Sequence, residues 1–175
     1  LSRFRQRDGS LFESRCTGSQ LSEQWLISAA HCLFAPDGSR QILSLRYIAS
    51  PFALANSIAV TRVWVHREHD SGDQSTGNVA SYSGSDIALF KLAQSLPINK
   101  RPILASPLAN NPVNWVDSFA YPSDKARHSL WFSRCRASLW QRGEQALSDI
   151  YSLDCFSHEG QSGAALLQTI SGTPH

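Results

Sequence analysis

The sequence has no long hydrophobic run. Nowhere do its 175 residues approach the roughly 20 consecutive apolar residues that a membrane helix needs, so we expect no membrane span. The first ten residues, LSRFRQRDGS, contain no apolar stretch either, unlike a secretory signal peptide. We therefore expect a mature or trimmed form of the protein.

Neither sign of charge is in large excess: the chain has 16 Lys and Arg against 14 Asp and Glu. The net charge of +2 is too small to predict binding to nucleic acid, and we expect no nucleic-acid partner. Arginines gather at the start (Arg3, Arg5 and Arg7), but Asp8 and Glu13 follow closely, so we interpret this stretch as a solvated segment. Apolar residues make up 42% of the chain, which is enough for a packed globular core.

The four cysteines form no C-x-x-C pair, so the spacing typical of tetrahedral zinc sites is missing. Cys16 and Cys32 lie in the first third of the chain, whereas Cys135 and Cys155 lie in the last third. This distribution favours two disulfides, each within one part of the chain, over a metal site. Disulfides imply an oxidising compartment, so we expect a secreted or periplasmic protein.

Two histidines, His66 and His69, occur close together in the stretch VHREHD and raise the question of a metal site. In a strand, residues three apart point to opposite faces of the sheet, which argues against shared coordination. We predict neither a metal nor another cofactor.

Long helical periodicity is missing as well, and strand signals dominate. Short runs rich in β-branched and aromatic residues occur at 24–30, 42–49, 58–66, 86–92, 114–121, 129–139 and 146–153. One helical turn is expected around 29–33. Many short strands with Gly-, Ser-, Asn- and Pro-rich connections are typical of an all-β barrel or sandwich.

The stretch 91–112 carries four prolines and little alternation, so we predict an irregular connection there. It separates a first β lobe, residues 1–90, from a second β lobe, residues 113–175.

Three short stretches carry candidate catalytic residues. His31 follows an apolar strand in WLISAAHC, Asp86 precedes one in SDIALFKL, and Ser162 lies between glycines in GQSG. A serine hydroxyl is a weak nucleophile that needs a base within hydrogen-bond reach, and histidine titrates in the right pH range. The histidine needs a buried acceptor that fixes its tautomer and stabilises the imidazolium, a role that suits Asp86.

Gly160 lets the backbone turn so that N–H groups, and not side chains, point at a developing oxyanion. We expect the N–H groups of Gly160 and Ser162 to be the donors of this oxyanion hole. Each motif alone is a weak signal, because isolated turns of this kind are common. Together they follow the order His, Asp, Ser, which is one of the few orders known for catalytic triads.

Taken together, WLISAAHC, DIALFKL and GQSGAAL resemble the trypsin/chymotrypsin-type serine peptidase family, over about residues 10–170. The resemblance implies two antiparallel β-barrels with the active site in the cleft between them. It implies hydrolysis of a protein or peptide substrate through an acyl-enzyme, with His31, Asp86 and Ser162 as the triad. It also implies a Cys16–Cys32 disulfide that brackets the histidine loop.

Gln161 departs from the animal digestive members of the family, which have an Asp here that pairs with a newly freed N-terminal ammonium. An amide has no charge for such a pair, and LSR is not the usual Ile-Val-Gly-Gly start. The pattern is closer to the bacterial, glutamyl-endopeptidase-like branch, and we expect an N-terminal extension to leave activity intact. A Cys135–Cys155 disulfide fits this branch and would anchor the loop before the serine.

The primary specificity pocket is expected around three residues. The register of the family sets Phe156 and Ser157 near the base and wall of this pocket, and His158 at its rim or on the surface. No acid occupies the position that selects Arg or Lys substrates.

The family normally continues for several strands, whereas this chain stops thirteen residues after Ser162. We therefore expect an incomplete second barrel: the chain is clipped, lacks a C-terminal segment, or is completed by a further chain. A barrel without these strands would expose an unpaired edge. Besides a secreted serine endopeptidase, two alternatives stay open: an inactive or incomplete homologue that acts as a binding or regulatory module, and an esterase with the same triad.

Overall fold

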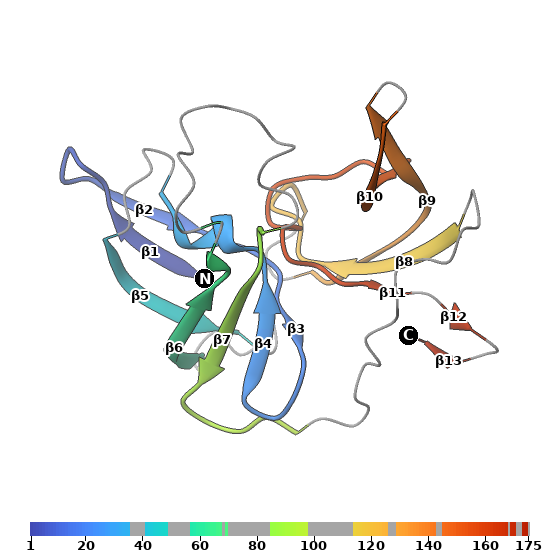
Figure 1. Ribbon diagram of the computed structural model, residues 1–175. Coiled ribbons are helices and arrows are strands. Elements are labelled where there is room, and N and C mark those ends of the chain that lie inside the picture. Colours follow the sequence, from blue (N-terminus) through green and yellow to red (C-terminus); the bar gives the residue numbers. More distant parts are fainter. Residues whose placement is uncertain are drawn as a thin grey trace.

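The computed structural model describes residues 1–35, 41–48, 57–67, 69, 85–97, 114–125, 129–142, 145–167, 169–170 and 173–174. Within these residues the chain forms β-strands and one short 3₁₀ helix, and the paired strands run antiparallel (Figure 1). The predicted all-β class with two antiparallel β units is confirmed. In the described part of the chain, no helix is long and apolar enough to cross a membrane.

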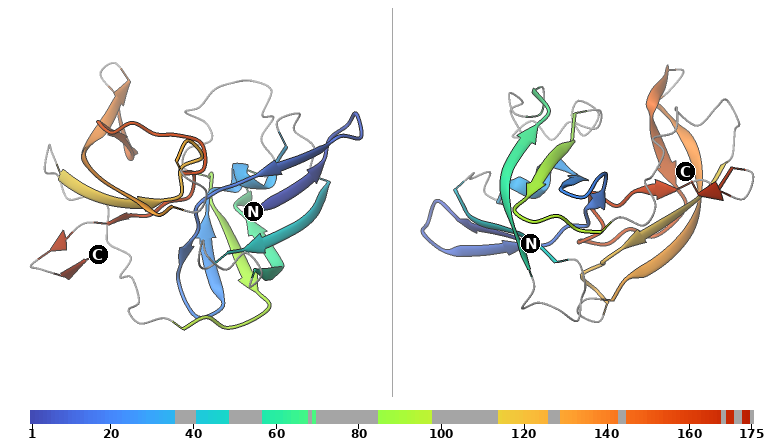
Figure 2. Two further views of the ribbon diagram at one scale, coloured as in Figure 1. Left: turned by 180° about the vertical axis from the view of Figure 1, so that it is seen from behind. Right: turned by 90° about the horizontal axis from the view of Figure 1, so that it is seen from below.

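The first sheet has seven strands and curls into an open, barrel-like unit (Figure 2). Its strands are β1 (Ser2–Arg5), β2 (Leu11–Ser14), β3 (Ser19–Gln20), β4 (Trp25–Ser28), β5 (Ile42–Tyr47), β6 (Ile58–Val65) and β7 (Ala88–Leu92). Across the sheet they follow the order β2-β1-β5-β6-β7-β4-β3. β4 therefore pairs with β3, its neighbour along the chain, and with β7, the last strand of this unit.

The second sheet has four strands in the order β10-β9-β8-β11. Its strands are β8 (Asn114–Ala120), β9 (Trp131–Arg142), β10 (Gln145–Leu153) and β11 (Leu166–Leu167). A separate hairpin follows, made of β12 (Thr169–Ile170) and β13 (Thr173–Pro174). Among the described residues this second unit is thus an open sheet.

The core of the first sheet follows from strict alternation along its strands. In β7, Ala88, Phe90 and Leu92 are buried while the residues between them are partly exposed, because successive side chains of a strand point to opposite faces. The other buried members of this core are Leu26, Ala30, Leu33 and Ile58. The 3₁₀ helix Ala30–Leu33, close to the predicted helical turn, thus packs on the sheet through its apolar residues.

The N-terminal segment was expected to be solvated, and its charged residues are exposed, but the segment also forms part of the first sheet. It forms the hairpin β1–β2, in which Ser2 and Phe4 are buried while Arg3 and Arg5 stay exposed. An Asp-Gly turn closes the hairpin, with Gly9 at a φ of 84°. The dense charge at the start of the chain concealed both signals, the alternation and the turn.

On its exposed face, the second sheet carries cross-strand pairs between β8 and β9. The rings of Phe119 and Phe132 lie 5.2 Å apart, and the Arg134 guanidinium binds the carboxylate of Asp117 with a shortest distance of 2.7 Å. The opposite face holds a small core around Val116 and Cys135. Pairs of this kind stabilise antiparallel strands through directly opposed side chains.

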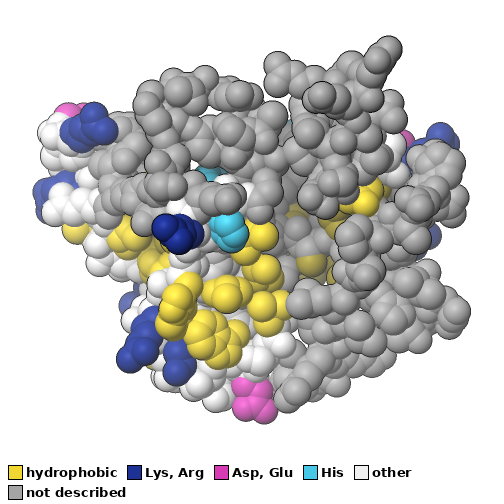
Figure 3. Space-filling view, viewed as in Figure 1, with side chains coloured by type: hydrophobic (Ala, Val, Ile, Leu, Met, Phe, Trp, Pro, Cys, Tyr) yellow, Lys and Arg dark blue, Asp and Glu magenta, His cyan; other side chains and the backbone are white. Residues whose placement is uncertain are grey.

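Hydrophobic side chains also gather on the outer side of the first sheet, over β4, β6 and β7 (Figure 3). The indoles of Trp25 and Trp64 lie 4.8 Å apart, and the Lys91 ammonium lies 5.8 Å from the Trp25 ring. Trp64 remains 43% exposed, so this aromatic patch belongs to the surface, where a tilted contact between the two indoles and a cation–π contact hold it together.

The strands of the first sheet come from residues 2–92 and those of the second from residues 114–167. Residues 98–113, which hold most of the predicted connection, lie outside the described residues. The division into lobes at 90 and 113 therefore stays a prediction.

Candidate functional site

His31 reaches the surface because its neighbours anchor the 3₁₀ helix. Ala30, Cys32 and Leu33 are buried, whereas half of the His31 side chain is exposed. The apolar strand β4 leads directly into this helix, so the histidine stands at the open end of a rigid strand.

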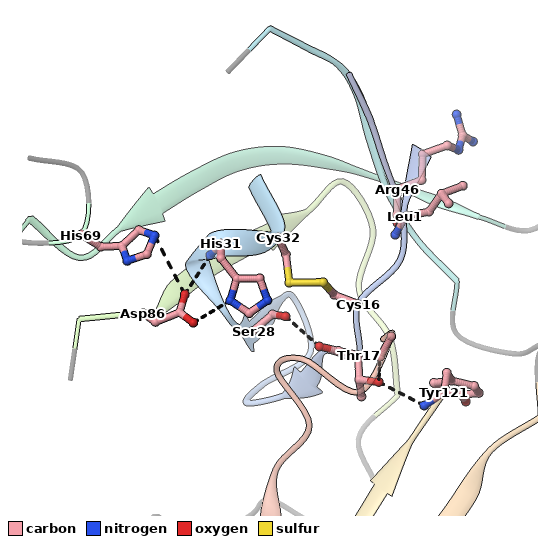
Figure 4. Close-up of a disulfide and its surroundings, with 11 residues drawn as sticks. Leu1, Cys16, Thr17, Ser28, His31, Cys32, Arg46, His69, Asp86 and Tyr121 are labelled. Carbon is pink, nitrogen blue, oxygen red and sulfur yellow. Dashed lines mark hydrogen bonds and ion pairs between the residues drawn. A yellow bond between two sulfur atoms is a disulfide. The ribbon is translucent and has the colours of Figure 1, made fainter. Parts of the chain in front are cut away.

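Asp86 binds His31 twice (Figure 4). The Nδ1 of His31 lies 2.6 Å from Oδ2 of Asp86, and the His31 backbone N–H donates to Oδ1 at 2.8 Å. The pairing of Ser28 with Ala88 between β4 and β7 sets this geometry, because it brings the residues before β7 beside the helix after β4. Strand pairing, and not sequence proximity, therefore joins the two side chains.

The carboxylate of Asp86 remains ionised. Burial raises the pKa of Asp86, but the hydrogen bonds from the ring and the backbone N–H of His31 outweigh it, so the pKa lies below its ordinary value. An ionised carboxylate only accepts hydrogen bonds, so the Nδ1 of His31 carries the proton. In the neutral imidazole, Nε2 then keeps its lone pair and can act as a base.

Sequence reasoning missed a second histidine at this site. His69 is 2% exposed, and its Nε2 lies 4.0 Å from Oδ1 of Asp86. In a strand, His66 and His69 would point to opposite faces, but β6 ends at Val65 and the His69 N–H donates to the carbonyl of His66 in a turn. The carboxylate thus lies between two imidazoles, as Figure 4 shows.

The turn that carries Ser162 requires glycine on both sides. Gly160 has a φ of 89° and Gly163 a φ of 81°, which side chains other than glycine rarely adopt. A Cβ at Gly160 would collide with the carbonyl oxygen of Tyr121, and one at Gly163 would collide with the hydroxyl of Ser28. The turn therefore packs directly against backbone from both sheets, including the segment that leads to the 3₁₀ helix.

Thr17 holds this turn in place, a role that the sequence did not reveal. Its backbone N–H donates to the carbonyl of Ser162 at 2.9 Å, and its hydroxyl donates to the carbonyl of Gly160 at 2.8 Å. The same hydroxyl accepts the N–H of Tyr121 at 3.1 Å. Thr17 is 5% exposed, so these bonds are shielded from water.

Two disulfides tie the site to the sheets. Cys16, next to Thr17, bonds to Cys32 next to His31, with 6.3 Å between the Cα atoms. Cys135 in β9 bonds to Cys155, with 5.4 Å between the Cα atoms, and so ties the chain before the serine turn to the second sheet. Both pairs match those that the family resemblance implied.

One further hydrogen bond orients the backbone at Gly160. The N–H of Ser123 donates to the carbonyl of Glu159 at 2.7 Å. In a trans peptide the N–H points away from the carbonyl, so this bond fixes the direction of the Gly160 N–H. A preset N–H is what an oxyanion hole requires.

This arrangement of sheets, glycine turn and paired His31 and Asp86 can be compared with known families. A model of the Trypsin family matches residues 3–126, well over half of the chain. The chain belongs to the trypsin family. The predicted resemblance is thereby confirmed.

Individual relatives of the trypsin family match part of the chain. Chymotrypsin-like elastase family member 1 of Macaca fascicularis is 30% identical over 91 residues, 52% of this chain and 32% of that protein. Trypsin Tyr p 3.0101 of Tyrophagus putrescentiae is 32% identical over 94 residues, 53% and 30% of the two chains. The matched part of this chain thus spans about a third of the length of these curated relatives.

Among solved structures, a Glu endopeptidase in complex with MPD superposes with a TM-score of 0.57 and 18% identity. The superposition covers 95% of this chain and 73% of the other. At this identity the likeness shows the fold alone.

Gln161 and His158 fold the serine turn onto itself. The His158 N–H donates to Oε1 of Gln161 at 3.1 Å, and the Gln161 N–H donates to the His158 carbonyl at 3.2 Å. At the place where digestive members of the trypsin family have an Asp, this side chain therefore serves the local turn.

The three residues predicted for the specificity pocket lie at the surface. Phe156 is 92% exposed, Ser157 is exposed, and the His158 ring lies 3.5 Å from the carboxylate of Asp124. Phe156, His158 and Gln161 line a hollow of about 420 Å³ on the second sheet, and Ser157 is not among its lining residues. Their part in specificity stays a prediction.

A metal site does not arise from the described residues around His31. Cys16, His31 and Cys32 lie within reach of one another, but the two sulfurs are joined in the disulfide and cannot bind a metal as thiolates.

Proposed function

We propose that the chain is the catalytic part of a serine endopeptidase, with Ser162 as nucleophile, His31 as general base and Asp86 as the orienting carboxylate. The observation that carries this proposal is the double hydrogen bond from His31 to Asp86, in the segment on which the Gly160–Gly163 turn packs. Membership of the trypsin family supports it.

In the proposed reaction, Oγ of Ser162 attacks the carbonyl carbon of a peptide bond while Nε2 of His31 takes the hydroxyl proton. Asp86 stabilises the imidazolium that forms. The N–H groups of Gly160 and Ser162 donate to the oxyanion of the tetrahedral intermediate. When the intermediate collapses, His31 gives its proton to the leaving amine and the acyl group stays on Ser162. Water, activated by His31, then releases the acid.

The substrate is a protein or peptide, and the two disulfides support an oxidising, extracytoplasmic compartment. Gln161 has no charge to pair with a freed amino terminus, and its side chain already binds the His158 N–H. We therefore propose that activity does not depend on insertion of a new terminus at this turn.

The test is covalent labelling with a fluorophosphonate probe, followed by mass spectrometry of the labelled peptide. The probe should modify Ser162, and Ser162→Ala should abolish labelling. The matched control is Ser95→Ala, which changes an exposed serine just after β7 and should label like the parent. A folded chain that fails to label would instead favour a binding or regulatory role.

A further inference from the structure

A cavity of about 340 Å³ lies beside the Cys16–Cys32 disulfide, and its volume is within the range of roughly 300–1,000 Å³ usual for ligand sites. One wall comes from Cys16 and Gly18 of the first sheet, and the other from 121–123 after β8. Figure 4 shows Tyr121, which lines the cavity, on the far side of the disulfide from His31.

The walls of the cavity are the segments that hold the serine turn. Thr17, between the two wall residues of the first sheet, binds the carbonyls of Gly160 and Ser162. Backbone atoms of Tyr121 and Ser123 lie against Gly160. A peptide whose reacting carbonyl lies at this turn would reach the cavity within a few residues, because an extended chain advances by roughly 3.3 Å per residue.

The lining of the cavity is mainly cationic. It contains the side chains of Arg3, Arg15, Arg46 and Lys125, against the single carboxylate of Glu13. Glu13 receives Nε of Arg3 and Nη2 of Arg15, each at 3.1 Å. Burial raises the pKa of Glu13, but these hydrogen bonds outweigh it and keep the carboxylate ionised. Two guanidinium groups thus share one negative charge and retain further N–H donors, since each has five.

The other two cations differ in how they are engaged. The Arg46 guanidinium donates to the hydroxyl and the carbonyl of Ser57, at 2.6 and 3.0 Å, so it is directed away from the cavity. The Lys125 ammonium lies 3.0 Å from the carboxylate of Asp124 and 4.8 Å from the centre of the Trp131 ring, and neither of these two residues lines the cavity. An anionic group in the cavity would therefore meet the guanidinium groups of Arg3 and Arg15, which keep N–H donors beyond those that bind Glu13.

The position of the disulfide indicates which side of the scissile bond would occupy the cavity. In the proposed mechanism the leaving amine takes its proton from His31, so the leaving part of the peptide lies beside His31 and Cys32. Cys16, the partner of Cys32, forms the cavity wall. The cavity therefore lies on the leaving-group side of the scissile bond.

We propose that this cavity is a subsite for an acidic side chain within the first three residues after the scissile bond. This inference rests on the proposed function, which supplies the direction of the peptide. The substrate class that it implies is peptides with an acidic residue soon after the scissile bond.

The test uses peptides with one fixed acyl side in which each of the three leaving-side positions is Asp or Asn, or Glu or Gln. At one position the acid should raise kcat/KM about tenfold over its amide, equivalent to about 1.4 kcal/mol. Arg3→Gln and Arg15→Gln should each move this ratio toward one. Arg62→Gln is the matched control, because Arg62 is exposed on β6 outside the cavity, and it should keep both rate and ratio.

A second measurement separates this inference from the proposed function. Fluorescently labelled versions of the Asp and Asn peptides are titrated with the Ser162→Ala protein, and binding is followed by fluorescence anisotropy. Tighter binding of the Asp peptide that weakens with salt supports the subsite even if hydrolysis is never seen, in which case only the proposed function fails. Equal affinities, or equal rates at all three positions, would overturn the subsite.

Discussion

Removal of one hydroxyl should uncouple the serine turn from the first sheet. Thr17→Val keeps the shape of the side chain but leaves the Gly160 carbonyl and the Tyr121 N–H without their partner. Each buried group left unsatisfied costs about 1–3 kcal/mol, and the carbonyl is the more deeply buried of the two, so we expect a loss of about 2–4 kcal/mol in the free energy of unfolding. Urea denaturation followed by tryptophan fluorescence measures it.

The same change should slow catalysis more than binding. Loss of an entire oxyanion donor costs about a hundredfold to a thousandfold in kcat, and a turn that is loosened but present should cost less, about tenfold to a hundredfold. KM should change little, because Thr17 is buried away from substrate. The assay is steady-state hydrolysis of a chromogenic peptide, with a fluorophosphonate titration to count active sites.

Thr17→Ser supplies the control, because it removes only the methyl group and keeps the hydroxyl. It should retain most of the activity and stability. If Thr17→Val turned over like the parent while folded, or if Thr17→Ser were equally impaired, the hydroxyl would not be what positions the turn.

The remaining predictions concern Asp86 and Gly163. Because the folded pKa of Asp86 lies below its ordinary value, its stabilising effect is full above the unfolded pKa and is lost as the pH falls through the folded pKa. Asp86→Asn should therefore flatten the acid limb of unfolding free energy against pH, and His69→Leu should move that limb to higher pH; an unchanged limb in both variants would contradict this. Gly163→Ala should destabilise by about 2–4 kcal/mol, since a positive φ costs about 1–3 kcal/mol and the new Cβ also meets Ser28. Gly9→Ala shares the positive φ but has open space, so in urea melts it should lose clearly less, and equal losses would refute the steric part.

The segments around His31 and Asp86 could be found from the sequence because each is marked by a short local motif. A histidine follows one apolar strand and an aspartate precedes another, and both strands were predicted close to their observed bounds. The distance of 2.6 Å between the side chains is a different matter, because it depends on the pairing of β4 with β7. No pattern within either segment encodes that pairing.

Thr17 could not be predicted for the same reason. Its hydroxyl binds a carbonyl 143 residues away, and a threonine after a cysteine carries no local sign of such a partner. The hairpin β1–β2 is the opposite case, since the alternation of Ser2 and Phe4 with arginines was visible but was outweighed by charge. Long-range contacts were inaccessible in principle, whereas the hairpin was misjudged.

The contact between the serine turn and the segment around Thr17, called the seam below, is formed largely by backbone atoms. The Ser162 carbonyl accepts a backbone N–H, and Gly163 packs against the main chain at Thr17. Such contacts depend on the path of the chain rather than on side-chain identity, so they tolerate substitution at most positions. A fold likeness can therefore persist at 18% identity. Substitutions should be felt at the few positions where the seam needs a particular side chain or none, which are Thr17, Gly160 and Gly163.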